Sequence, residues 1–410
     1  MSVSPQSFFA RFRNELGLVI AIFAVLSITS MINQDYFREP WRNFRDIAQE
    51  TSLVGIFALG AAIVIIAGGI DLSSGTMILF SASVCVLVTY IFAPISGGRP
   101  NPAQASDFVV WCGVGAALAT GLLVGTFHAW LITIVKLPPF VATLATLVGL
   151  RSLTKIMNGG ITDSLGIKVQ SINASASLFG ELRVWWIPVV VFLVLGTGLW
   201  LLMNRTVVGR HLYALGGNEE AARLSGINTD NLKWLAYSIG SVTASIAGVL
   251  YAAKISTCTP SSMGVGYELN AIAAAVVGGC SLQGGTGLIP GVMLGVLFLQ
   301  VVIDAVAKVF KTNPDDWKGQ IVGLLVVLAV AFNEIRRGGT GGRKRMFPGA
   351  IGWVTVPMLA LVLTLEVFAA DTQHRLGASL AVGGAAFVAL LSRKLFEDYA
   401  GQATAVRAES

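Results

Sequence analysis

Side chains that could carry protons or ions through an apolar protein are few in this sequence. Four carboxylates lie within or beside apolar runs: Asp71, Glu268, Asp304 and Glu366. His128 lies in another apolar stretch, where a histidine more often packs between helices than relays protons. An ion-coupled carrier usually keeps a connected set of ionisable groups inside its bundle. No chain of carboxylates and histidines links these positions, so the sequence disfavours a proton relay.

Catalytic motifs are also missing from the sequence. No GxSxG nucleophile turn, HExxH zinc motif or paired aspartate motif stands out, and the four cysteines lack a metal-binding spacing. A GxxxxGK[ST] phosphate loop, which would bind ATP, is absent as well. We therefore expect no catalytic residue, metal or cofactor on this chain, and any ATP that drives it must be bound by another subunit.

The composition places the chain in a membrane. Hydrophobic residues make up 54% of its 410 residues, charged residues make up 12%, and the mean hydropathy is +0.74. Soluble domains carry about 25% charged residues, so this chain has too few charges to cover a water-exposed surface. The net charge of +6 forms no basic stripe, which argues against nucleic acid as a partner. We predict a polytopic protein in contact with membrane lipid.

Apolar runs of about 20 residues are needed to cross the hydrocarbon core as helices. The sequence has such runs at roughly 16–32, 52–67, 75–93, 108–135, 140–157, 185–203, 234–253, 288–306, 319–335, 350–370 and 377–391. A further run, 269–279, has half that length and ends in glycines. Strands are not expected, because the runs are continuous rather than alternating. The predicted fold is an all-α polytopic membrane protein with about ten core transmembrane helices and an extra C-terminal pair.

The distribution of charge predicts which loops face the cytoplasm. The first run follows Arg11 and Arg13 and lacks a cleavage site, so we interpret it as a retained helix with a cytoplasmic N-terminus. The basic segment 336–345 and the loop 204–233 then lie in the cytoplasm, and 151–184 form the longest outer loop. Segment 36–50 mixes aromatic and charged residues, which is typical of an anchoring helix in the membrane interface.

An internal repeat divides the predicted core into two related halves. The segment Ala61 to Thr76 aligns without gaps on Ala271 to Thr286, and the identities concentrate in the pattern GG-x-x-L-x-x-GT. In both copies a glycine pair interrupts an apolar helix and a polar turn follows. Duplicated glycine breaks of this kind indicate a substrate path between two halves of a transporter. The spans make the repeats parallel, but the half-length run 269–279 leaves an inverted arrangement open.

Polar and glycine residues of the two breaks are the candidates for the translocation path. They are Gly68, Gly69, Asp71, Ser73, Ser74, Gly75, Glu268, Gly278, Gly279, Ser281, Gln283, Gly284 and Gly285. The alternative is that the polar groups cap broken helices and that the glycines allow close helix packing.

A short helix is predicted inside the cytoplasmic loop 204–233. Asn218 can cap it, Glu219 and Glu220 suit its first turn, and Gly226 can end it in the left-handed conformation. Two turns are too short to cross a membrane. The small residues Ala221 and Ala222 would allow another protein to approach closely, although an ordinary surface connector is the alternative.

These motifs resemble those of a known family. Glu220, Ala221 and Ala222 with Gly226 resemble the EAA-x3-G loop of ATP-binding-cassette importer permeases. The surrounding GR-x3-A-x-GGN-x2-AA-R-x-SGI pattern, GGIDLSSG (68–75) and GYELNAIAAAVVGGCSLQGGTG (266–287) are similar to the permeases for ribose, xylose and related monosaccharides. That group shares a family with branched-chain amino-acid permeases. The similarity runs from about residue 16 to residue 335.

The resemblance implies a permease of a bacterial cytoplasmic (inner) membrane that acts without chemistry of its own. Its partners would be a second permease copy, a cytoplasmic ATP-binding subunit and a periplasmic or lipid-anchored sugar-binding protein. The residues of the coupling loop would be Gly216, Asn218, Glu219, Glu220, Ala221, Ala222, Gly226 and Ile227. Cys280 stands where the family commonly has threonine, and Asn270 where aspartate is common.

The predicted domains are a permease core, 1–345, and an extra helix pair with a tail, 346–410. Within the core, the first repeat lies near 52–157 and the second near 234–335, on either side of the coupling loop 204–233. Two alternatives to a monosaccharide permease stay open. One is a branched-chain amino-acid permease, which would need an apolar pocket, and the other is an ion-coupled secondary carrier.

Overall fold

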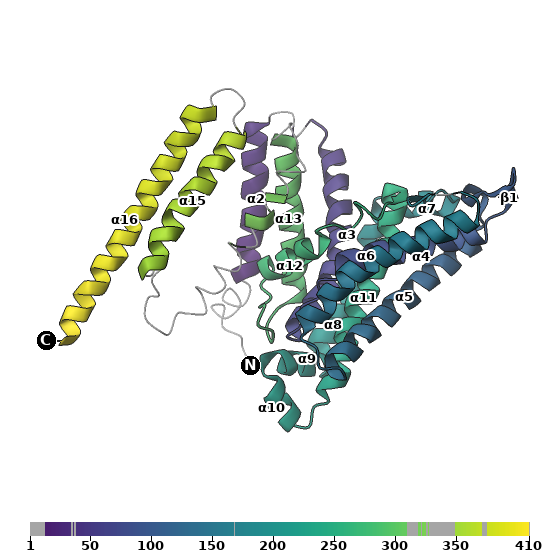
Figure 1. The fold of residues 1–410 in the computed structure, drawn as a ribbon, viewed down its shortest axis with the longest axis horizontal. Helices are drawn as coiled ribbons and strands as arrows, with labels where there is room; N and C mark the ends of the chain where they lie inside the picture. Colours follow the sequence, from purple (N-terminus) through teal and green to yellow (C-terminus); the bar gives the residue numbers. More distant parts are fainter. Residues whose placement is uncertain are drawn as a thin grey trace, which may run out of the picture. The chain divides into compact units, whose positions relative to one another are not determined.

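The chain folds as helices with two short strand pairs. The computed structural model describes residues 13–33, 36, 38–167, 169–309, 319–320, 322–324, 327, 349–370 and 375–409 (Figure 1). The chain divides into two compact units, Met1–Asn333 and Glu334–Ser410. Among the described residues, nine helices are long and apolar enough to cross a membrane, eight of them in the first unit. The expectation of an all-α polytopic membrane protein is confirmed.

The described helices of the first unit, in chain order, are α2 (Arg13–Ile32), α3 (Pro40–Ile66), α4 (Ser74–Ile91), η1 (Pro102–Gln104), α5 (Asp107–Thr133), α6 (Pro139–Ser164), α7 (Ser177–Leu182), α8 (Trp186–Arg205), α9 (Val207–Gly217), α10 (Glu219–Leu224), α11 (Thr229–Ile255), α12 (Tyr267–Val277) and α13 (Ile289–Val309). The strands are β1 (Ile95–Ser96), β2 (Arg99–Pro100), β3 (Ile172–Asn173) and β4 (Thr257–Cys258). β1 pairs antiparallel with β2, and β3 with β4, so the second pair ties the segment after α6 to the end of α11.

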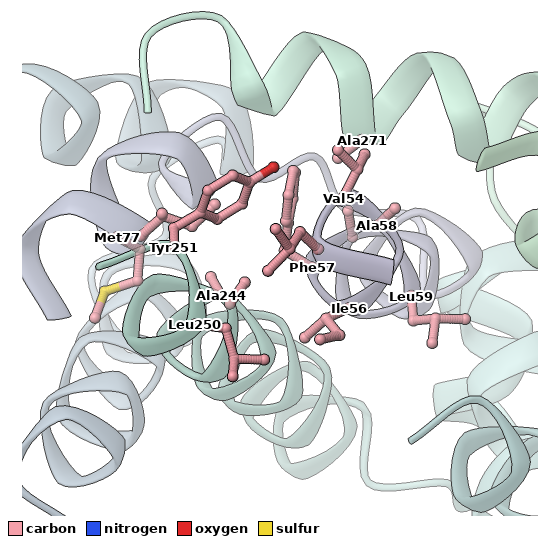
Figure 2. Packing of buried hydrophobic residues seen from close by; sticks show 14 of the residues in the cluster. Val54, Ile56, Phe57, Ala58, Leu59, Met77, Ala244, Leu250, Tyr251 and Ala271 are labelled. Carbon is pink, nitrogen blue, oxygen red and sulfur yellow. The ribbon is translucent and has the colours of Figure 1, made fainter. Parts of the chain in front are cut away.

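Helices α3, α4 and α11 form the centre of the first unit. The stretch 51–66 of α3 is buried throughout, and α3 packs against α8, α11, α12 and α13. Figure 2 shows Phe57 and Ile56 of α3 beside Ala244 and Leu250 of α11. Helices α2, α6 and α8 keep many large apolar side chains exposed, as lipid-facing helices do. The central helices therefore hold the core and the outer ones meet the bilayer.

Close contact between α5 and α11 depends on glycines. A Cβ atom on Gly121 would lie 2.3 Å from the Ser245 hydroxyl oxygen, and one on Gly125 would lie 2.6 Å from the Ser238 Cα atom. Small residues spaced by four allow helix backbones to approach in a membrane, where packing rather than water drives association. This seam fixes α11 beside α5.

The second span begins earlier than predicted. Residues 40–50, expected to form a separate interfacial helix, are the first turns of α3. Pro40 starts the helix without loss of a hydrogen bond, and Arg42 pairs with Glu39 over 3.1 Å on an exposed turn. Trp41 packs against Phe44 and Trp185, so an aromatic cluster still marks this end. The prediction of a separate helix was wrong.

Two loops contain more helix than predicted. The span expected at 140–157 continues as α6 to Ser164, so the predicted outer loop 151–184 begins at residue 165. The loop 204–233, which we expect to be cytoplasmic, contains an additional helix, α9, before the short helix α10. Thr206 caps α9, because its hydroxyl accepts a hydrogen bond from the Gly209 N–H.

The second unit is a pair of helices, α15 (Gly349–Ala370) and α16 (Arg375–Glu409), which pack against each other. Gly383 gives Thr364 room, since a Cβ there would lie 1.7 Å from the Thr364 hydroxyl oxygen. These helices cover the two spans expected at 350–370 and 377–391. The basic segment 336–345 and most of the span expected at 319–335 lie outside the described residues.

Candidate functional site

Helix α3 ends in a glycine cap, as the sequence predicts. Gly68 has φ +82°, a conformation that residues with a side chain rarely adopt. Its N–H donates to the Ile65 carbonyl over 2.9 Å, and the Gly69 N–H donates to the Val64 carbonyl over 2.9 Å. These bonds form a Schellman motif, which satisfies the last carbonyls of a helix.

Helix α12 ends in the same motif. Gly279 has φ +95°, and its N–H donates to the Val276 carbonyl over 2.9 Å. The Cys280 N–H donates to the Ala275 carbonyl over 2.9 Å. The left-handed residue is the first glycine of the pair in α3 and the second in α12, so α12 runs one residue further. The repeated pattern thus makes two helix breaks with the same hydrogen bonding.

The polar turns after the breaks are also alike. An Asp71 carboxylate oxygen accepts hydrogen bonds from the N–H and the hydroxyl of Ser73, over 2.8 and 2.6 Å. At the aligned positions of the second copy, the Ser281 hydroxyl oxygen accepts a hydrogen bond from the Gln283 N–H over 3.2 Å. Asp71, Ser73 and Ser281 are buried. In both copies the side chain two residues after the glycine pair holds the turn.

The two breaks meet each other and the loop 204–233. The Gly285 N–H donates to the carbonyl of Ile66, the last residue of α3, over 2.9 Å. A Cβ on Gly216, near the end of α9, would lie 1.8 Å from that same carbonyl oxygen and 2.5 Å from the Gly285 nitrogen. A Cβ on Gly284 would lie 2.8 Å from the Gly68 Cα. We call this backbone contact among Gly68, Gly216, Gly284 and Gly285 the glycine junction.

Helices α3 and α12 run in the same direction into the glycine junction. The Phe57 ring of α3 stacks on the Tyr267 ring at the start of α12, with centroids 6.1 Å apart. At the other ends of these helices, Ile66 and Gly285 are hydrogen bonded. The two helices that precede the breaks are therefore parallel, in agreement with the spans predicted from sequence.

The predicted coupling helix, α10, begins directly after the junction. Asn218 caps α10, since its side-chain oxygen accepts a hydrogen bond from the Ala221 N–H over 2.9 Å. Gly226 has φ +80° and ends the helix, with the Ile227 N–H donating to the Ala222 carbonyl over 3.1 Å. Both capping predictions are confirmed. The helix has six residues, in agreement with the two turns expected.

Charged residues of α10 are held by ion pairs at its surface. Glu219 pairs with Lys233 at the start of α11 over 2.5 Å, and Glu220 pairs with Arg223 over 2.8 Å. The hydrogen bond and charge of Glu220 raise the pKa of the exposed Arg223 guanidinium. Ala222 is buried beneath the helix, whereas Leu224 is 80% exposed. An exposed apolar side chain on a short, rigidly capped helix suits contact with another protein.

A cavity of about 520 Å³ opens beside the glycine junction. Its lining includes Gly68, Lys136, Gly216, Asn218, Tyr237 and Gln283. Lys136, in the turn between α5 and α6, has φ +64°, which is uncommon for a residue with a side chain. Residues of the loop 204–233, of the first break and of the α5–α6 turn thus line the same cavity.

Asp71 also lies near a group of buried polar side chains from α5 and α11. A Cβ on Gly69 would lie 2.4 Å from the Tyr237 hydroxyl oxygen, and the Tyr237 and His128 rings lie 6.1 Å apart. The His128 Nε2 atom hydrogen bonds with the Thr146 hydroxyl over 2.6 Å. His128 is fully buried, in agreement with the packing role expected for it.

Gly75 and Glu268 are brought together on the other side of the first break. A Cβ on Gly75 would lie 2.3 Å from a Glu268 carboxylate oxygen and 2.3 Å from the Gly264 carbonyl. Ser74 begins α4 and its hydroxyl is buried. By contrast, Gly278 faces α13, where a Cβ would lie 2.5 Å from the Gly291 carbonyl. Gly75 and Glu268 thus meet across the break, whereas Gly278 serves helix packing.

Arg151 is a residue of this region that the sequence analysis missed. Its guanidinium donates to the carbonyls of Pro260 and Met263, over 2.8 and 3.2 Å, and its charge faces Glu268. Arg151 therefore holds the segment between α11 and α12 against α6. The signal was available, since an arginine inside an apolar span requires a partner.

A family model described as "Branched-chain amino acid transport system / permease component" matches residues 43–330. That match spans both helix breaks, the glycine junction and α10. The chain belongs to this permease family. Its family membership and its apolar helices together show that the permease is a multi-pass membrane protein.

Individual relatives agree with this assignment. The ribose import permease protein of Escherichia coli (strain K12) is 34% identical over 308 residues, which cover 73% of the permease and 88% of the relative. The ribose import permease protein of Bacillus subtilis (strain 168) is 34% identical over 287 residues, covering 70% and 82%. The autoinducer 2 import system permease protein of Yersinia pestis (strain Pestoides F) is 31% identical over 316 residues, covering 77% and 83%. No solved structure matches the chain.

Proposed function

We propose that the permease is the transmembrane subunit of an ATP-driven importer of a ribose-like monosaccharide. The proposal draws on two relatives that are named ribose import permeases and aligned over more than four fifths of their length. It also draws on GGIDLSSG and the second break, which resemble the motifs of sugar permeases rather than amino-acid permeases.

The observation that carries the proposal is the glycine junction beside the exposed helix α10. Gly216 precedes the α10 cap by two residues and touches the backbones of both helix breaks. A displacement of α10 by an ATPase subunit would therefore reach α3 and α12 together. Because the junction has no room for a side chain, it transmits a shift through backbone contacts.

The proposed assembly has two permease copies, ATP-binding subunits on the cytoplasmic face and a sugar-binding protein on the outer face. The permease would lie in a bacterial cytoplasmic membrane with its N-terminus inside, and α10 would seat on the ATPase. It would catalyse no reaction. A sugar would need only transient hydrogen bonds along the path, for which Asp71, Ser73, Glu268, Ser281 and Gln283 are candidates.

Replacing Gly226 tests the coupling role of α10. Gly226→Val puts a β-branched residue at φ +80°, whereas Gly226→Asn keeps a residue that tolerates this conformation. No neighbouring atom would meet a Cβ there, so the change acts on the cap rather than on packing. In vesicles carrying the permease with its ATPase and binding protein, the valine variant should hydrolyse ATP with sugar uptake lowered about tenfold or more. The asparagine variant should keep most of the uptake, and full uptake by the valine variant would refute the coupling role.

Reconstitution also separates the rival functions. An ion-coupled carrier would transport when the permease alone is placed in vesicles under a proton or sodium gradient. The proposed importer should show no uptake under those conditions, and its uptake should require ATP, the ATPase subunit and the sugar-binding protein. Uptake of leucine in place of D-ribose by the complete system would favour the amino-acid alternative.

A further inference from the structure

A second cavity lies away from the glycine junction. It has a volume of about 780 Å³ and lies among α3, α11, α12 and α13, with Gly319, Val322 and Gly323 also in its lining. Ligand pockets for small molecules fall in the range of about 300–1,000 Å³. Its residues include Glu50 in the exposed first half of α3 and Lys254 at the end of α11. None of the candidate path residues lines this cavity. Tyr267 and Leu269, the neighbours of the candidate Glu268 in α12, do line it.

Polar side chains with unused hydrogen-bonding capacity face this cavity. Gln300, on the apolar helix α13, is 94% buried and lines the cavity. Within the described part of the chain, the side chains of Asn270, Tyr251 and Tyr267 form no hydrogen bond. A polar side chain that lines a cavity needs a hydrogen-bonding partner inside that cavity. These groups therefore have a hydrogen-bonding ligand or water as their natural partner.

Aromatic rings form one wall of the cavity. The Tyr251 and Tyr267 rings have centroids 5.1 Å apart, and Phe57 stacks behind Tyr267. Figure 2 shows the Tyr251 hydroxyl oxygen pointing away from Met77. Aromatic faces offer a large, rigid apolar surface, and tyrosine adds a polar group at its edge. A wall of this kind suits a ligand that has C–H groups on one face and hydroxyls around its rim.

The charged groups of the cavity are already paired. Glu50 forms an ion pair with Lys254. Asp304 pairs with Lys308 over 3.2 Å and accepts a hydrogen bond from the Tyr36 hydroxyl over 3.0 Å. A zwitterionic amino acid would need a free cation and a free anion of the protein at its two ends. The pairing therefore favours a neutral ligand.

We propose that this cavity is a monosaccharide-binding site of the permease, with Gln300 and Asn270 hydrogen bonding the sugar hydroxyls against the Tyr251–Tyr267 wall. The proposal deepens the proposed function and rests on it. Amide side chains both donate and accept, so they suit hydroxyls, which do the same. The aromatic wall would take the C–H face of the sugar ring. Binding is expected to be weak, because a translocation path must release its substrate.

Saturation-transfer NMR on the purified full-length permease tests this site, with D-ribose as the probe and L-leucine as the comparison. Saturation of protein aromatic protons should reach the ring C–H protons of D-ribose and not the leucine methyl groups. Gln300→Leu and Asn270→Leu should each weaken the transfer about fivefold, the effect of one lost hydrogen bond. Gln104→Leu, which makes the same change at an exposed site in η1, should leave it unchanged.

Two results would overturn the site: no transfer to D-ribose, or equal transfer in the wild type and both leucine variants. Transfer to leucine alone would overturn the ligand class. Asn270 is only partly buried, so its variant should fold even if Gln300→Leu does not. Failure of the proposed function is distinguishable, since it would appear as loss of ATP-dependent uptake by the reconstituted wild-type complex. Intact uptake without NMR transfer would reject this cavity and leave the importer assignment standing.

Discussion

At Gly216 the backbone of the coupling loop touches both helix breaks, and a methyl group has no space. Gly216→Ala would place a Cβ 1.8 Å from the Ile66 carbonyl oxygen, so the backbone must move. Overpacking of this kind costs about 1–3 kcal/mol. We expect a lower thermal unfolding temperature in detergent. We also expect a loss of sugar uptake that is larger than the loss of stability alone would cause, because the displaced atoms join the two breaks.

The neighbouring Gly217 provides the control for this prediction. A Cβ there would meet no atom within 4 Å, although the residue belongs to the same helix end. Gly217→Ala should change the free energy of unfolding by no more than about 0.5 kcal/mol. Equal behaviour of the two variants would show that the glycine junction carries neither stability nor coupling.

Tyr36, in the turn between α2 and α3, gives a pH dependence whose sign follows from its surroundings. Burial, and then the charge and hydrogen bond of Asp304, raise the pKa of the Tyr36 phenol well above its usual value of about 10. Above pH 10 the phenol loses its proton in the unfolded chain and keeps it in the folded one. Its contribution to stability is therefore complete below pH 10 and falls as the pH rises.

The Tyr36→Phe variant isolates this contribution. Its unfolding temperature should fall less between pH 9 and pH 11 than that of the wild type, as measured by circular dichroism in detergent. Tyr399→Phe, at an exposed residue of α16, should behave as the wild type does. A wild-type slope in the Tyr36 variant would contradict the assigned contact.

At the scale of elements, the segment between α11 and α12 depends on Arg151. The arginine donates to the Pro260 and Met263 carbonyls from α6. Arg151→Met removes both bonds and leaves these two carbonyls without their donor. Arg151→Lys keeps the charge but lacks the planar fork of donors.

We expect faster amide hydrogen exchange across residues 256–266 in Arg151→Met, with an intermediate effect in Arg151→Lys. Exchange within α3 should stay unchanged, because its buried hydrogen bonds are intrahelical. If exchange accelerates equally in α3 and in 256–266, the arginine supports the whole fold rather than this segment.

Local sequence predicted the ends of helices better than it predicted their meeting points. Asn218 and Gly226 could be assigned as caps because capping involves residues three or four apart. The glycine pairs could be assigned as breaks for the same reason. The contact among Gly68, Gly216 and Gly285 joins segments far apart in the chain, and no periodicity encodes it. Polar turns at 40–50 and 207–217 were misjudged, because their helices extend beyond the apolar runs that defined the predicted spans.

The cavity at α13 was missed for a related reason. Gln300 lies in a run that was interpreted as apolar, and its place in the cavity wall appears only when the helices are packed. Asn270 was noted as a departure from the family pattern, yet the sequence did not show that it faces Gln300's cavity. Side chains that meet across helices thus required the structure, whereas side chains that cap a helix did not.

At the scale of the whole molecule, the repeat gives the permease two parallel helices, α3 and α12, that break at one place. One hydrogen bond, from the Gly285 N–H to the Ile66 carbonyl, joins the two breaks, and both have backbone contact with the loop that leads to α10. A force applied at α10 would therefore act on both halves through one rigid junction. This arrangement explains how a chain with few ionisable groups in its spans could be driven by an external ATPase.

The second unit, α15 with α16, allows a test of which part of the chain transports. The family match ends at residue 330, and the compact unit that holds both breaks, the junction and both cavities ends at Asn333. A chain that stops after Arg345 should therefore keep its helical circular dichroism per residue and at least about half of the wild-type ATP-dependent uptake. The same truncation combined with Gly216→Ala should lose uptake as the full-length variant does. If the truncated chain folds, inserts and binds its ATPase but no longer transports, the added helix pair takes part in the transport cycle, and the core of the permease extends beyond residue 345.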